Sequence, residues 1–140
     1  MEFRQFDNKF ILRLDRGEEI IETLKSFCTD QQIKLGWIHG IGAVNKITVG
    51  LFDTDSKEYH SSELTGHFEI TNLSGNISTM KDETYLHLHI NVADEKHKTY
   101  GGHLNAATIS ATGEIIIEAM DGEIDRQFSE EIGLNLFKFE

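Results

Sequence analysis

Hydrophobic side chains change their spacing along the chain, and the change separates one predicted helix from several predicted strands. Near the start, Phe10, Leu12 and Leu14 recur at every second position, a period that is typical of a β-strand. The next apolar residues follow at spacings of one, three and four: Ile20, Ile21, Leu24, Phe27 and Cys28. Because such spacings place side chains on one stripe of a helix, we predict a helix over residues 17–31.

Two further features concern this helix. Asp15 stands three residues before Glu18, which is the spacing of a capping box at a helix start.

Cys28 falls on the apolar stripe, so we interpret it as a buried structural thiol in preference to a nucleophile. It is the only cysteine of the chain, which excludes an intrachain disulfide and any metal site built from several cysteines. A metal ion must therefore be bound by histidine or carboxylate groups.

The remainder of the chain predicts strands. Gly, Asn, Asp and Ser separate segments that are rich in Val, Ile, Thr, Phe and Tyr. The predicted strands cover residues 36–39, 43–52, 63–73, 85–92, 104–111 and 114–120, with a closing strand near 134–139. One helix packed on a mostly antiparallel, twisted sheet is the simplest arrangement, an α/β fold of the α+β kind. Since one helix cannot cover both faces of a large sheet, a partner subunit could cover the rest.

The composition predicts a single globular domain that spans residues 1–140. Hydrophobic residues make up 39% of the chain and charged residues 26%, a balance typical of a protein that buries a core. The chain has neither a basic start followed by an apolar run nor a stretch of about 20 apolar residues. We therefore expect a cytoplasmic protein that does not enter a membrane.

The charge balance argues against nucleic acid as a direct partner. The chain has 13 basic and 24 acidic side chains, a net charge of −11 before its seven histidines are counted. Affinity for phosphate backbones comes largely from Lys and Arg side chains that displace counterions. Direct binding to DNA or to an anionic membrane is therefore disfavoured.

Two histidines share one face of a predicted strand. In residues 85–92 the even positions are apolar, whereas His87, His89 and Asn91 occupy the other face. Same-face neighbours on a strand lie roughly 6–7 Å apart, which allows two imidazole rings to converge on one ion. The alternative is that both histidines are polar residues on a solvated sheet face.

A third histidine follows the turn after this strand. Residues 94–102 are rich in turn formers and precede His103, as in a hairpin whose return strand brings His103 near the other pair. Gly101 and Gly102 would let the backbone approach closely there. Three histidines without cysteine form the ligand set of an open site for zinc or a similar divalent transition metal, in which water or substrate fills the remaining position.

Two acidic residues are candidates for proton transfer in a catalytic version of this site. Glu69 and Glu114 are isolated acids among apolar strand residues. Glu69 shares a predicted strand face with His67, and either residue could orient a metal-bound imidazole by accepting its second N–H. An exposed polar position is the favoured interpretation for His67.

Three weaker patterns carry other interpretations. Residues 40–42 (Gly-Ile-Gly) lack the third glycine of a dinucleotide fingerprint, so we predict a tight turn between strands. Residues 53–55 (Asp-Thr-Asp) begin like a calcium loop, but Glu58 and Leu64 stand where glycine and glutamate are required. The acidic segment 121–131 is predicted to form a solvated loop or a short surface helix.

Several ordered motifs together resemble the plant and prokaryote conserved (PPC) domain family along nearly the whole chain. They are Gly-Ile-Gly-Ala at 40–43, Gly-His-Phe-Glu-Ile at 66–70, Leu-Ser-Gly-Asn-Ile-Ser at 73–78, Leu-His-Leu-His at 86–89, Gly-Gly-His-Leu at 101–104 and Glu-Ile-Ile-Ile at 114–117. The resemblance implies a small α/β fold, a homotrimer and, in prokaryotic members, a metal, usually zinc. Matched residue by residue, its ligands are His87, His89 and His103.

The resemblance also brings a DNA-binding label, which the sequence does not support. In plant members the domain follows an AT-hook centred on Arg-Gly-Arg-Pro, whereas this chain contains no proline. Two hypotheses remain. The first is a stand-alone trimeric module whose metal site is structural or senses a small-molecule or protein ligand; DNA contact is less favoured. The second is a metal-dependent enzyme that acts on a small molecule, with Glu69 or Glu114 as base.

Overall fold

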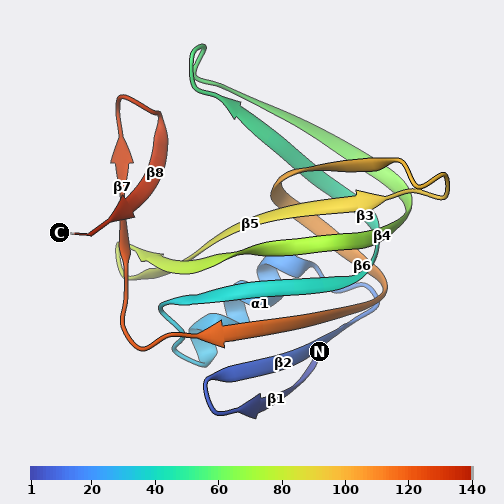
Figure 1. Ribbon diagram of the computed structural model, residues 1–140, viewed down its shortest axis with the longest axis horizontal. Coiled ribbons are helices and arrows are strands. Elements are labelled where there is room, and N and C mark those ends of the chain that lie inside the picture. Colours follow the sequence, from blue (N-terminus) through green and yellow to red (C-terminus); the bar gives the residue numbers. More distant parts are fainter. Residues whose placement is uncertain (140) are drawn as a thin grey trace.

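Strands make up most of the chain, and six of them form one antiparallel sheet in the order β1-β2-β6-β3-β4-β5. The computed structural model describes residues 1–139 (Figure 1). The elements are β1 (Glu2–Phe6), β2 (Lys9–Asp15), α1 (Ile20–Asp30), β3 (Gly36–Asp53), β4 (Glu58–Met80), β5 (Glu83–Ala93), β6 (Thr99–Ala119), β7 (Asp125–Ser129) and β8 (Leu134–Lys138). The predicted fold class, a mostly antiparallel sheet with one flanking helix, is confirmed.

The helix covers one face of the sheet (Figure 1). It begins later than predicted, at Ile20, because Glu19 is the N-cap and its carboxylate accepts the N–H of Glu22. The predicted capping pair forms only in part: the carboxylate of Glu18 accepts the N–H of Asp15, ahead of the helix. Cys28 is fully buried, and burial raises the pKa of its thiol to about 12, as expected of a structural residue.

Two predicted strand breaks are wrong, because glycine allows the strand to bend without ending. Residues 40–42 lie inside β3 at an irregularity in its pairing with β4, and β3 continues to Asp53. Gly42 has φ +150°, and a Cβ there would run into the carbonyl of Thr112 on β6. The predicted strands 104–111 and 114–120 are likewise parts of one strand, β6, which ends at Ala119.

The acidic segment 121–131 forms neither a loop throughout nor a helix, so that prediction is wrong. It contains β7, which pairs with β8 in a separate two-stranded hairpin. The closing strand near 134–139 is confirmed as β8, although it pairs with β7 instead of the main sheet. Strand β1 has no counterpart among the predicted elements.

The sheet face opposite the helix includes the side of β5 on which His89 lies. Residues that are directly paired on neighbouring antiparallel strands share a face. The register links Ile11, Ile116, His39, Ser74 and His89 in one row across five strands. The face that holds His89 is therefore continuous with exposed apolar side chains on β2 and β6.

No helix within residues 1–139 has the length and apolar character needed to cross a membrane.

Close approach of β4 to β5 at Gly75 gives a first prediction. A Cβ at Gly75 would lie 2.7 Å from Leu88 Cα and would also clash with the His87 carbonyl, both of them backbone groups. We expect Gly75→Ala to lower the free energy of unfolding by roughly 3 kcal/mol, measured by urea denaturation. Ser61→Ala, at an exposed position of the same strand, should change it by less than about 0.5 kcal/mol. Equal effects of the two substitutions would contradict this packing.

Candidate metal centre

Strand β5 positions His87 and His89. The alternating pattern buries Leu88 and Ile90 in the core, which leaves the histidines on the opposite face. Pairing with β4 fixes this orientation, because His87 lies opposite Asn76 and His89 opposite Ser74. The predicted common face of the two imidazoles is confirmed by the distance of 5.1 Å between their ring centroids.

Strand β6 returns along β5 and brings His103 directly opposite His89. The predicted close approach of the backbone at the double glycine is confirmed. A Cβ on Gly101 would lie 2.6 Å from the carbonyl oxygen of Ile90, and one on Gly102 would lie 2.7 Å from that of Gly50. Any larger residue would push β6 away from β5 or β3, and His103 would move with it.

The three imidazoles face a common point. The ring centroid of His103 lies 5.2 Å from that of His87 and 5.7 Å from that of His89. One ring nitrogen from each histidine lies within 4.8 Å of the others. Zinc bonds of 2.0–2.1 Å set the edge of a tetrahedron at about 3.3 Å, so modest side-chain rotation brings these nitrogens to ligating positions. The donor set therefore fits zinc or a similar transition metal.

His87 and His103 are available as neutral ligands. Burial lowers the pKa of His87 to about 4, with further contributions from His103, Arg126 and His89. Burial and then the nearby His89 also lower the pKa of His103. No hydrogen bond joins a ring nitrogen of the triad to another protein group in residues 1–139. Near neutral pH, lone pairs on His87 and His103 are therefore free to bind a metal ion.

The histidines open into a cavity of about 830 Å³. One wall is the arm formed by the end of β3 and the start of β4, and another is the β7–β8 hairpin. Figure 1 shows the arm and this hairpin extending beyond the sheet on the same side. Apolar side chains from both walls line the space: Val49, Leu51, Phe52, Leu134, Leu136 and Phe137. The lining contains no carboxylate from the described part of the chain.

Arg126 is a site residue that the sequence analysis missed. It lies on β7, lines the cavity and is only 7% exposed. Its guanidinium donates hydrogen bonds to Ser78 Oγ, Asn76 Oδ1 and the carbonyl of Asn135, each at 2.8 Å. It also lies over the rings of Tyr85 and Phe137. The only signal in the sequence was a basic residue that interrupts an acidic segment.

The other candidate residues lie outside this cavity. Glu69 is exposed on β4, opposite Ala93, and Glu114 is exposed on β6, opposite Arg13. Neither lines the space beside the histidines, and neither does His67, which is exposed as its favoured interpretation expected. The structure thus brings together the three predicted metal ligands but neither predicted catalytic acid.

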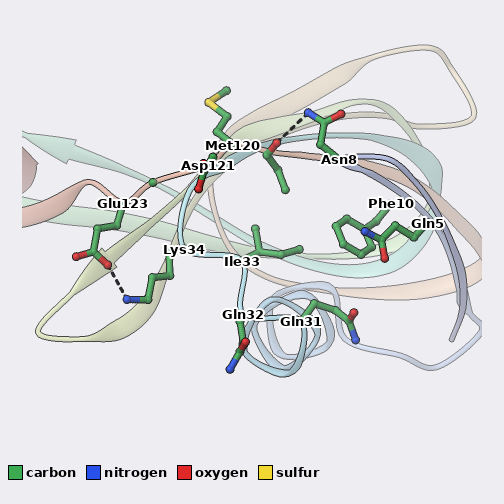
Figure 2. Close-up of a pocket in the computed structure, with 12 residues that line it drawn as sticks. Gln5, Asn8, Phe10, Gln31, Gln32, Ile33, Lys34, Met120, Asp121 and Glu123 are labelled. Carbon is green, nitrogen blue, oxygen red and sulfur yellow. Dashed lines mark hydrogen bonds and ion pairs between the residues drawn. The ribbon is translucent and has the colours of Figure 1, made fainter.

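A second hollow, of about 440 Å³, lies between the end of α1 and the segment that follows β6 (Figure 2). Two of its polar groups are engaged: Asn8 donates to the carbonyl of Ala119, and Lys34 forms an ion pair with Glu123 at 2.6 Å. Among the described residues, the histidine triad is the only cluster suited to hold a metal ion. The second hollow is therefore the weaker candidate for a functional site.

Fold and site together define a small α+β protein with a three-histidine cluster in a partly apolar cavity. The chain belongs to the family of the Plants and Prokaryotes Conserved (PCC) domain, whose model matches residues 1–121. This is the family, also written PPC, that the sequence motifs resemble. The match ends before β7, so the hairpin that carries Arg126 lies beyond the matched segment.

Solved structures share this fold along almost their whole length. A candidate DNA-binding protein from Bacteroides thetaiotaomicron is 35% identical with a TM-score of 0.96, over 99% of this chain and 96% of that one. A metal-containing protein from Archaeoglobus fulgidus is 32% identical with a TM-score of 0.87, over 98% and 96%. A PPC protein from Pyrococcus horikoshii is 28% identical with a TM-score of 0.86, over 98% and 93%.

Among curated proteins, the bifunctional protein GlmU of a Synechococcus species is 31% identical over 119 residues. The aligned region covers 83% of this chain but only 18% of that protein. The chain thus spans about a fifth of the length of this relative.

The lowered pKa of His87 gives a prediction for the metal-free protein. Between about pH 6.5 and pH 4 the unfolded chain binds a proton at this histidine and the folded chain does not, so stability falls as pH falls through this range. His87→Gln should remove part of this loss, on the order of 1 kcal/mol after allowance for solvent screening. Thermal unfolding at each pH measures it. His67→Gln is the control, and identical pH profiles for wild type and His87→Gln would contradict the prediction.

Proposed function

We propose that this protein is a metal-binding member of its family, in which His87, His89 and His103 hold one zinc ion or a similar divalent transition metal. The observation that carries the proposal is the convergence of three imidazoles whose ring nitrogens accept or donate no hydrogen bond to other protein groups in residues 1–139. The metal-containing protein from A. fulgidus, which has the same fold, supports this proposal. When bound, such an ion supplies Lewis-acid chemistry and one coordination position open to a ligand.

The cavity favours a ligand-binding module over an enzyme. A general base must lie within hydrogen-bond reach of the proton that it removes. Among the described residues no carboxylate lines the cavity, and His60, the lining histidine outside the triad, is exposed. Glu69 and Glu114, the acids considered for that role, lie elsewhere on the sheet. An enzyme acting on a small molecule is the second candidate, because the cavity is large and mostly apolar.

DNA binding is less well supported. The relative from B. thetaiotaomicron is a candidate DNA-binding protein, but the present chain carries a net charge of −11. In an assembly of three copies the repulsion of a phosphate backbone would be greater still.

We propose that the protein acts as a homotrimer. The sheet face opposite the helix exposes four large apolar residues: Ile11, Trp37, Ile41 and Ile116. Ile11 and Ile116 are directly paired, so at least part of this patch is continuous. Apolar surface of this kind is typical of a subunit interface. A second copy of the chain is the occupant that the family resemblance implies.

Metal content tests the site. Protein purified without a histidine tag should contain close to one equivalent of zinc or a similar metal per chain, measured by inductively coupled plasma mass spectrometry. The double variant His87→Ala/His89→Ala should lose at least nine-tenths of it, because two of three ligands are removed. The control variant His67→Ala/His97→Asn changes two exposed histidines and should retain the metal. If wild type and the ligand variant take up the metal equally weakly, the proposed site is wrong.

Light scattering on a sizing column tests the assembly. The wild-type mass should be three times the 15.9 kDa of one chain. Ile116→Asp places a charge in the proposed interface and should shift the protein toward monomer. Ser26→Asp adds the same charge on the exposed side of α1 and should leave the trimer intact. A monomeric wild type would refute the homotrimer.

A further inference from the structure

Arg126 is a buried positive charge, and no described residue is its acidic partner. Three of its five N–H groups donate to neutral oxygens, those of Ser78, Asn76 and Asn135. No ion pair links it to any carboxylate within residues 1–139. Burial of a charge is unfavourable unless an opposite charge compensates for it. In a chain with 24 acidic residues, a cavity in which Arg126 is the only permanently charged lining group among residues 1–139 is well suited to an anion from outside.

The guanidinium lies next to the histidine triad. Asn76, which accepts a hydrogen bond from Arg126 Nη2, is the residue of β4 directly opposite His87. Arg126 and the three histidines line the same cavity. A metal ion at the triad would add a second positive charge close to the arginine, so an anionic group between them would meet cations on two sides.

The cavity walls indicate what the rest of the ligand is like. The rings of Tyr85 and Phe137 hold the guanidinium at 4.6 and 4.4 Å. Leu51, Leu134 and Leu136 add to the apolar lining and are exposed, so they are available to contact a ligand. An apolar group on the anion would bury this surface.

We propose that the cavity binds a small organic anion, with its carboxylate or phosphate-type group held by Arg126 beside the metal centre and its apolar group against the β7–β8 hairpin. The inference rests on the proposed function in that it assigns a ligand class to the same site. The guanidinium is suited to this role because two of its five N–H groups donate to no other residue in the described range and can bind a carboxylate or phosphate oxygen.

Benzoate and benzamide form a matched pair of probes, because they share the ring and differ in charge. Titration of the wild-type protein, followed by ¹H–¹⁵N spectra that include the arginine Nε–H signals, should show benzoate binding at least tenfold more tightly than benzamide and shifting the Arg126 signal. Phenylphosphonate serves as the phosphate-type probe: tighter binding than benzoate assigns a phosphate-type ligand, and weaker binding a carboxylate. Equal affinity for benzamide and both anions would overturn the proposal.

Arg126 also anchors the C-terminal hairpin, so the variants must separate binding from folding. Arg126→Gln should abolish the preference for benzoate over benzamide, whereas Arg16→Gln, at an exposed arginine, should preserve it. Circular dichroism establishes whether Arg126→Gln is folded. If it is unfolded, the comparison of benzoate with benzamide on the wild-type protein alone tests the anion site. A folded Arg126→Gln variant that keeps the full preference would overturn the proposal.

Two measurements on the wild-type protein, its zinc content and its preference for benzoate, separate the anion site from the metal centre. If the protein binds no zinc but still prefers benzoate, the anion site stands and the metal centre fails. If the protein binds zinc and discriminates against neither probe, the metal centre stands and the anion site fails.

Discussion

The candidate site depends on the pairing of β5 with the start of β6. This pairing closes β3, β4, β5 and β6 into a ring and places His103 directly opposite His89. Because strand side chains alternate, a slip of one residue would turn His103 away from the other two imidazoles. Backbone hydrogen bonds, and not the histidines themselves, therefore hold the cluster together. The glycines at 101 and 102 let the strands approach closely enough for these bonds to form.

Much of this arrangement could be predicted from local sequence patterns. The period-two alternation around His87 and His89 places their side chains on one face, and the turn-rich segment before His103 indicates a returning strand. The helix stripe and the buried Cys28 follow from spacing in the same way. These features depend on residues that are close in sequence, so the pattern within one sequence is enough to predict them.

Other features depend on partners far along the chain. Whether the glycines at 40 and 42 end a strand or bend it is decided by pairing with β4 and β6 on either side, which local composition does not reveal. Arg126 is buried only because β7 pairs with β8 and packs near Ser78 on β4, 48 residues earlier. The acidic residues around Arg126 in the sequence predict an exposed side chain, but tertiary packing buries it. Glu69 and Glu114 are the opposite case. Their position among apolar neighbours suggested a role in the site, but both are exposed elsewhere on the sheet.

The C-terminal hairpin is a wall of the cavity that lies outside the segment matched by the family model, while every histidine of the triad lies within it. The residues that would bind a cation and the residues that would contact an anion beside it therefore lie in different segments of the chain, which Arg126 joins through its hydrogen bonds to Asn76 and Ser78 of β4. Strand β8 lines the cavity but, within residues 1–139, pairs only with β7, so a change of its side chains would alter the shape and polarity beside the triad and leave every strand pairing of the ring in place. One sheet with three fixed imidazoles can thus present cavities of different form, according to the side chains of a single five-residue strand.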